Sequence, residues 1–162
     1  MITYLKLTAK ELFGELKRLD FNQEYFELFN LNIFSQRDCN SQEENVYFIG
    51  FDSSNNKLVS ISKFEIMHKY NYSIFFLKYI EVSSCFRGQG LLKKMINFVN
   101  SNLQENSLVV SYSYDLTELG EKSKILKKLS DNLNYPVITD FDNFYNFYST
   151  GNKKYLKLET GE

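Results

Sequence analysis

The chain has 162 residues, of which 43% are hydrophobic and 24% charged, and its formal net charge is −1. These values are typical of one globular domain over residues 1–162, and the small net charge predicts no nucleic-acid partner. One histidine, His68, and two cysteines, Cys39 and Cys85, lack metal-ligand spacing, so neither a metal site nor a disulfide framework is expected. No apolar run reaches the roughly 18 residues that span a bilayer and no secretory leader is visible, so we expect a cytoplasmic protein without membrane contact.

The first elements of the chain are a predicted strand and two predicted helices. Apolar and polar residues alternate over residues 2–7, which is typical of a strand. Thr8, with Glu11 three residues later, forms a capping-box pattern and predicts that a helix begins there. A second helix is expected at residues 23–34.

The middle of the chain predicts a β-hairpin followed by a strand–helix–strand unit. Residues 46–52 and 57–66 have strand patterns on either side of the turn sequence SSNN. Residues 73–82 are almost entirely apolar, as expected of a strand covered on both faces. Residues 91–103 carry apolar side chains at helical spacing, and residues 107–114 form another apolar strand. Such a strand–helix–strand connection normally makes the two strands parallel neighbours.

The last third of the chain predicts a helix and two strands. Thr117 is a candidate cap for a helix whose apolar stripe ends near Leu133, and strands are expected at residues 135–139 and 153–159. Between these strands lies an aromatic cluster, which either packs in the core or lines a substrate pocket: Phe141, Phe144, Tyr145, Phe147 and Tyr148. The order of elements predicts an α+β fold, with a mixed, mostly antiparallel sheet, a central parallel strand pair and helices on both faces. The remaining strands are expected to be antiparallel.

Two of the seven glycines, Gly88 and Gly90, lie between the strand at 73–82 and the helix that follows. The first amide groups of a helix have no partner within the helix, and the helix dipole adds partial positive charge there. Glycines permit positive φ and close approach of the backbone, and Arg87, Lys93 and Lys94 add cationic charge. These features predict a phosphate cradle. The alternative is an ordinary glycine-containing surface turn.

The segment VSSCFRGQG resembles the signature of the GNAT superfamily of acyl-CoA-dependent N-acetyltransferases. In that signature the central strand ends in Val, followed by x-Pro-x-Tyr/Phe and then Arg-Gly-x-Gly-x-Gly/Ala at the start of a helix. The matching positions are Val82, Phe86, Arg87, Gly88 and Gly90. Ser84 replaces the usual proline, and Leu92 replaces the last small residue, where it could crowd the cofactor. The order of elements resembles the family over nearly the whole chain.

The resemblance implies a single GNAT-like domain that transfers an acetyl group from acetyl-CoA to an amine by direct attack on the thioester. It implies that the backbone near Ile80 and Val82 pairs with the pantetheine arm and that the amides from Arg87 to Leu92 hold the pyrophosphate. It further implies that the strands 73–82 and 107–114 splay apart to admit the thioester. The implied cofactor-binding residues are Ile80, Val82, Arg87, Gly88, Gln89, Gly90, Leu91 and Leu92.

Three side chains are candidates for the acid–base chemistry. Glu81 adjoins the implied thioester site, either as a general base or as an ion-paired strand carboxylate. Tyr112 or Tyr114 could protonate the leaving thiolate, or could simply pack in the core. Many relatives carry the acidic tyrosine in the helix that follows, but the helix expected here has none, so the acid, if present, has moved or is replaced. The oxyanion would be held by a backbone N–H near Val82.

Other functional interpretations remain open at this stage. One is a GNAT-fold module that binds acyl-CoA or a protein without turnover, and another is an unrelated α+β interaction protein. The amine acceptor is not identified by the sequence, and a homodimer is compatible with it.

Overall fold

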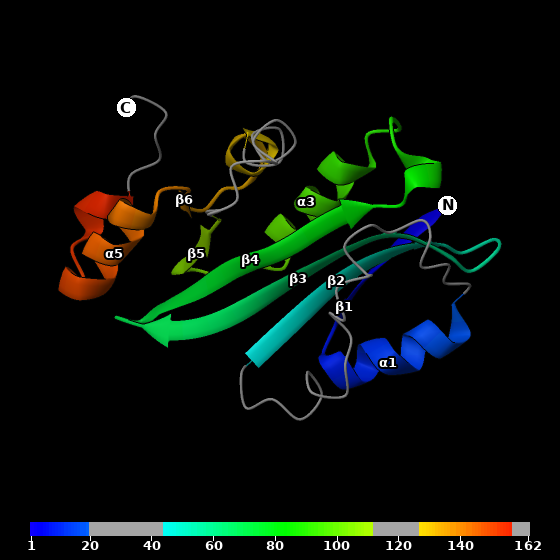
Figure 1. The fold of residues 1–162 in the computed structure, drawn as a ribbon, viewed down its shortest axis with the longest axis horizontal. Coiled ribbons are helices and arrows are strands. Elements are labelled where there is room, and N and C mark those ends of the chain that lie inside the picture. Colours follow the sequence, from blue (N-terminus) through cyan, green and yellow to red (C-terminus); the bar gives the residue numbers. More distant parts are fainter. Residues whose placement is uncertain (20–43, 112–126, 157–162) are drawn as a thin grey trace.

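The structure is a computed structural model, and it describes residues 1–19, 44–111 and 127–156 (Figure 1). The strands are β1 (Ile2–Leu7), β2 (Glu44–Asp52), β3 (Lys57–Lys69), β4 (Tyr72–Val82), β5 (Ser107–Val110) and β6 (Val137–Ile138). The α-helices are α1 (Ala9–Arg18), α3 (Leu91–Ser101) and α5 (Phe141–Thr150), and residues 127–132 are also helical. Short 3-10 helices occupy Ser84–Phe86 and Lys153–Leu156. The helix expected at 23–34 and the cap expected at Thr117 lie outside the described residues.

The six strands form one sheet in the order β1-β2-β3-β4-β5-β6. Neighbouring strands from β1 to β4 are antiparallel, whereas β5 is parallel to β4. This arrangement confirms the predicted mixed, mostly antiparallel sheet with a central parallel pair. The expectation that the remaining strands are antiparallel is wrong for β6, which is parallel to β5.

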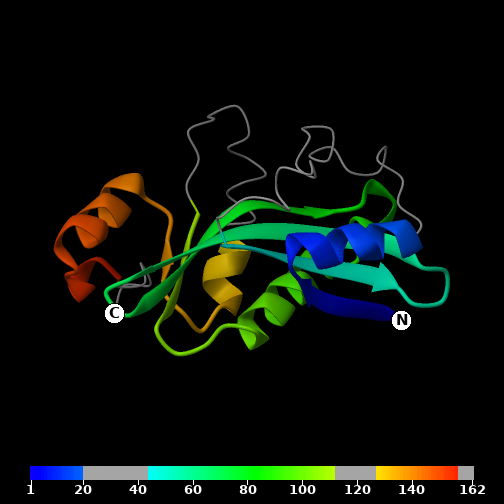
Figure 2. The ribbon, with the colours of Figure 1, turned by 90° about the horizontal axis from the view of Figure 1, so that it is seen from below.

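Helices cover both faces of the sheet, as predicted (Figure 2). Helix α1 begins with the predicted capping box at Thr8 and packs Leu12 and Leu19 against one face. Helix α3 and the helix at 127–132 pack on the opposite face, where Met95 and Leu129 are fully buried. In the described part of the chain, no helix has both the length and the apolar character needed to cross a membrane.

The C-terminal part differs from the sequence prediction. Residues 141–150 form helix α5, which was not predicted, and Lys153–Leu156 is a 3-10 helix, so the strand expected at 153–159 is wrong over these four residues. Helix α5 is capped by the side chain of Asp140 and ends at Gly151 in the left-handed region (φ +68°). Its buried residues, Phe144 and Phe147, complete a core cluster with Ile74 of β4 and Ile138 of β6.

Among the described strands, β4 is paired on both sides over its first half but on one side only over its second half, where the candidate site lies. Its first half pairs with β5, but the parallel ladder covers only Ser73–Phe76 against Ser107–Val110. A shift in the β3–β4 register leaves Lys78 without an opposite residue, because Lys63 pairs with Tyr79 and Phe64 with Leu77. From Leu77 to Val82, β4 therefore has β3 on one side and no paired strand among the described residues on the other.

Candidate functional site

A cleft of about 270 Å³ lies where β4 ends and α3 begins. Its lining residues are Ile80, Glu81, Val82, Phe86, Arg87, Gly88, Gly90, Leu91, Leu92 and Lys128. The cleft thus gathers every residue predicted to bind the cofactor except Gln89, which is exposed and does not line it. Glu81 and Val82 follow each other in β4 and pair with Ile61 and Ser60, so their side chains lie on opposite faces of the sheet. Because residues of both faces line the cleft, it runs along the open edge of β4.

The turn beside the cleft requires both of its glycines. Gly88 and Gly90 have φ angles of +83° and +71°, in the region that L-residues avoid. A Cβ atom added at either position would meet no protein atom within 4 Å. The glycines are therefore needed for the backbone conformation, and the space beside them is open.

The start of α3 leaves its first amide groups without helical partners. Gly90 occupies the N-cap position and provides no side-chain cap. By contrast, α1 and α5 are capped by the side chains of Thr8 and Asp140. The Lys94 amide donates to the Gly90 carbonyl at 3.3 Å, and the amides before it precede the first intrahelical hydrogen bond. Lys93 and Lys94 are exposed and do not line the cleft.

Arg87 fastens this turn to the end of β4. Its Nε donates to the Val82 carbonyl at 3.2 Å, and its Nη2 lies 3.4 Å from Oε1 of Glu81. The Glu81 side chain is only 7% exposed, whereas the Arg87 side chain is 44% exposed. The structure therefore shows Glu81 as an ion-paired carboxylate at the cleft wall, one of the two interpretations left open by the sequence. Much of the Arg87 charge is balanced by this partner.

Other predicted site residues have different outcomes. Tyr112 and Tyr114 lie outside the described residues, and β5, expected to extend to residue 114, ends at Val110. Leu92 lines the cleft while also packing against the main core cluster. Its side chain thus forms part of the wall at the position where the family signature has a small residue.

The sequence reasoning missed Lys128 as a cleft residue. Lys128 comes from the helix at 127–132, 36 residues after Leu92, and no local motif marks it. Phe86, which matches the family signature, also lines the cleft.

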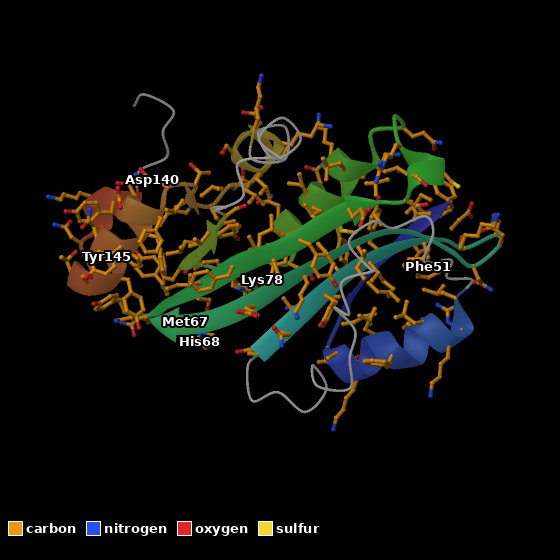
Figure 3. All side chains as sticks on the ribbon, viewed as in Figure 1. Phe51, Met67, His68, Lys78, Asp140 and Tyr145 are labelled. Carbon is orange, nitrogen blue, oxygen red and sulfur yellow. The ribbon has the colours of Figure 1, made fainter. Side chains whose placement is uncertain are left out.

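The aromatic cluster lies far from the cleft. Tyr145 marks α5 at one end of the molecule in Figure 3, near the start of β4, whereas the cleft lies at the other end of that strand. Phe144 and Phe147 are buried in the core, while Tyr145 is 58% exposed. The structure therefore shows core packing for Phe144 and Phe147, one of the two interpretations of the cluster.

No family model matches the chain, and no curated protein matches it. The fold, however, matches solved structures of N-acetyltransferases. An aminoglycoside acetyltransferase from an uncultured soil metagenomic sample, in complex with sisomicin, is 18% identical with a TM-score of 0.53, over 78% of this chain and 86% of that one. A ribosomal-protein-alanine N-acetyltransferase from Brucella melitensis biovar Abortus 2308 is 15% identical with a TM-score of 0.53, over 76% and 87%. A probable acetyltransferase is 11% identical with a TM-score of 0.54, over 78% and 87%. These matches confirm the GNAT fold that the VSSCFRGQG segment predicts.

Proposed function

We propose that this chain, which has the fold of the GNAT N-acetyltransferases, transfers an acetyl group from acetyl-CoA to an amine. The observation that carries the proposal is the cleft at the end of β4, because an open strand edge and an uncapped helix start line the same space. An open strand edge offers backbone hydrogen bonds to an extended, amide-containing arm. A helix start with free amides offers a site for phosphate. Coenzyme A has both chemical groups, joined to each other, and supplies the activated acyl group when bound.

The residues of the cleft have separate tasks in this proposal. The turn at Gly88 and Gly90 holds the amides of the helix start toward the cleft, and Arg87 keeps that turn attached to β4. The backbone of Ile80 and Val82 aligns the pantetheine arm, and a backbone N–H near Val82 stabilises negative charge that develops on the carbonyl oxygen. Holding two reactants in line can lower a barrier by roughly 7–11 kcal/mol, more than the roughly 4–5 kcal/mol needed to present a lysine-like amine in its neutral form at pH 7. A strong dedicated base is therefore not required.

Glu81 is the carboxylate that could accept a proton from the amine, directly or through water. It is buried at the cleft wall and paired with Arg87 at 3.4 Å, so a proton acceptor at this position would have to act beside that ion pair. Tyr112 and Tyr114 remain candidates for protonating the leaving thiolate. The nature of the amine is left open, since the similar structures act on acceptors as different as aminoglycosides and a ribosomal protein.

A second candidate function is acyl-CoA binding without turnover. It is favoured by the contact between the carboxylate of Glu81, at the cleft wall, and Arg87 at 3.4 Å. A wall formed by Leu92 instead of a small residue points the same way, since it narrows the space beside the helix start.

Two measurements test these proposals. In a thermal-shift series with acetyl-CoA, CoA and NAD, a ligand at 100 times its dissociation constant adds about 2.7 kcal/mol of stability. We expect acetyl-CoA and CoA, but not NAD, to raise the melting temperature, and Gly90→Glu to abolish this response by placing bulk and negative charge in the cleft. Release of free thiol from acetyl-CoA, measured with a panel of amines, then separates the transferase from the binding module. The proposed cleft is wrong if Gly90→Glu retains the full response.

A further inference from the structure

Lys128 faces the proposed cofactor cleft from a separate part of the chain. It belongs to the helix at 127–132, which is anchored because Leu129 and Leu133 are buried in the main core cluster. The Asn132 side chain donates to the Lys128 carbonyl at 2.8 Å and reinforces this short helix. The Lys128 backbone is thus fixed by packing, and its half-buried side chain lines the cleft together with Gly88, Gly90 and Leu91.

Lys128 differs from the other charged side chains of the cleft in its ion pairing. Among the residues that the structure describes, three ionisable side chains line the cleft, namely Glu81, Arg87 and Lys128. Glu81 and Arg87 pair with each other, so together they add little net charge. Within residues 1–19, 44–111 and 127–156, Lys128 forms no ion pair. The net positive charge of the cleft therefore comes mainly from Lys128 and from the amides at the start of α3.

We propose that Lys128 binds the diphosphate of the acyl donor and so makes the cleft select coenzyme A thioesters over donors that carry the pantetheine arm without a diphosphate. This inference rests on the proposed function and assigns the phosphate charge to a residue outside the Arg-Gly-x-Gly segment. A lysine ammonium is a compact point charge that suits phosphate oxygens, and the α3 amides approach the same space from the other wall. In this arrangement Arg87 shapes the turn and Lys128 supplies the countercharge.

The adjacent residue provides a matched control. Lys127 is exposed and does not line the cleft, so Lys127→Gln removes the same charge from the same helix without changing the cleft. Dissociation constants of the natural protein, Lys128→Gln, Lys127→Gln and Lys128→Arg would be measured by calorimetry for CoA, dephospho-CoA, 4′-phosphopantetheine and pantetheine. Melting temperatures without ligand verify that each variant is folded.

We expect a loss of affinity only in Lys128→Gln and only for the ligands that contain a diphosphate. Lys128→Gln should weaken CoA and dephospho-CoA alike by about tenfold, the size of one charge-assisted hydrogen bond. Pantetheine should be unaffected, Lys127→Gln should stay within about twofold of the natural protein for every ligand, and Lys128→Arg should recover most of the loss. High salt should shrink the difference between Lys128→Gln and the natural protein, because it screens the interaction.

Four results would overturn the inference. Equal affinities of Lys128→Gln and Lys127→Gln would show that position 128 has no special role. If Lys128→Gln lost affinity for CoA but not for dephospho-CoA, Lys128 would contact the 3′-phosphate instead of the diphosphate. If the loss of affinity extended to pantetheine, the effect of the substitution would be purely steric. Failure of the natural protein to bind any of these ligands would refute the proposed function as well, whereas unchanged binding in Lys128→Gln refutes this inference alone.

Discussion

Gly90 affects both the stability of the turn, through its left-handed backbone, and ligand binding, because it leaves the α3 amides uncovered. Substitutions at this position can separate these two effects. In Gly90→Ala, the new Cβ meets no protein atom within 4 Å, so the substitution creates no clash inside the protein. The φ angle of +71° nevertheless places an L-residue in the left-handed region, at a cost of about 1–2 kcal/mol. For a chain of this size, we expect a fall in melting temperature of roughly 2–8 °C.

Gly90→Asn is the informative partner of this variant. Asparagine tolerates the left-handed region better than alanine, so it should recover part of the lost stability. Its larger side chain nevertheless projects into the open space beside the α3 amides. We expect Gly90→Ala to lose mainly stability, and Gly90→Asn to lose mainly CoA affinity.

The assay pairs urea unfolding without ligand with calorimetric titration of CoA at 25 °C. Urea midpoints report the backbone strain, and the titrations report access to the amides independently of stability. If Gly90→Asn bound CoA as tightly as the natural protein, the amides around residue 90 would not hold the phosphate, and the placement of the ligand would be wrong. If Gly90→Ala were as stable as the natural protein, the left-handed conformation of the turn would be refuted.

Three further substitutions test the packing and the helix caps by urea unfolding. Gly14→Ala in α1 should raise the free energy of unfolding by about 0.5–1 kcal/mol, because its Cβ meets nothing within 4 Å and alanine favours the helix; a loss would contradict this. Gly50→Ala should lower it by about 1–3 kcal/mol, because its Cβ would lie 2.6 Å from the Ser60 Oγ; an unchanged midpoint would show that β2 and β3 are not packed as described. Thr8→Ala should cost about 1 kcal/mol by removing the side-chain hydrogen bond of the capping box. Hydrogen bonds from the Thr8 backbone and side chain lower the pKa of Glu11 in the folded state, so its stabilising contribution is present above about pH 4.3 and is lost as the pH falls through the lower folded value. Thr8→Ala keeps the backbone hydrogen bond, which is the larger cause, and loses the side-chain one, so its acid decline should be slightly shallower than that of the natural protein. Identical slopes would show that the Thr8 hydroxyl does not contribute to the lowered pKa of Glu11.

Strands β1 and β3 could be predicted because their apolar and polar residues alternate, and β4 because its sequence is almost entirely apolar. The hairpin between β2 and β3 could be predicted as well, since its turn sequence SSNN allows few other structures and ends at Asn56 with a φ of +58°. The turn at Gly88 and Gly90 could also be predicted from its local sequence. Its glycines occur where an L-residue would be strained, so the local sequence contains the constraint.

Helix α5 was missed because its sequence, FDNFYNFYST, is rich in aromatic residues and asparagine, which are weak helix formers. The signals that define it stand at its ends, where Asp140 caps the first turn and Gly151 ends the last. The strand expected at 153–159 is wrong over Lys153–Leu156, because alternation over a few residues is weak evidence. Asn152 instead accepts a hydrogen bond from the Lys154 amide in a tight turn there. Lys128 could not be predicted at all. Its place at the cleft depends on how Leu129 and Leu133 pack, which is decided by the tertiary structure.

The two walls of the cleft come from residues 80–92 and from Lys128, with most of α3 and the whole of β5 between them in the chain. A fragment that stops after α3 would retain the full VSSCFRGQG signature but only half of the space it serves. A ligand in the cleft would contact both segments, so amide hydrogen exchange should slow in both of them together. Recognition of the donor therefore requires the folded domain. The glycine motif is necessary for this recognition but not sufficient.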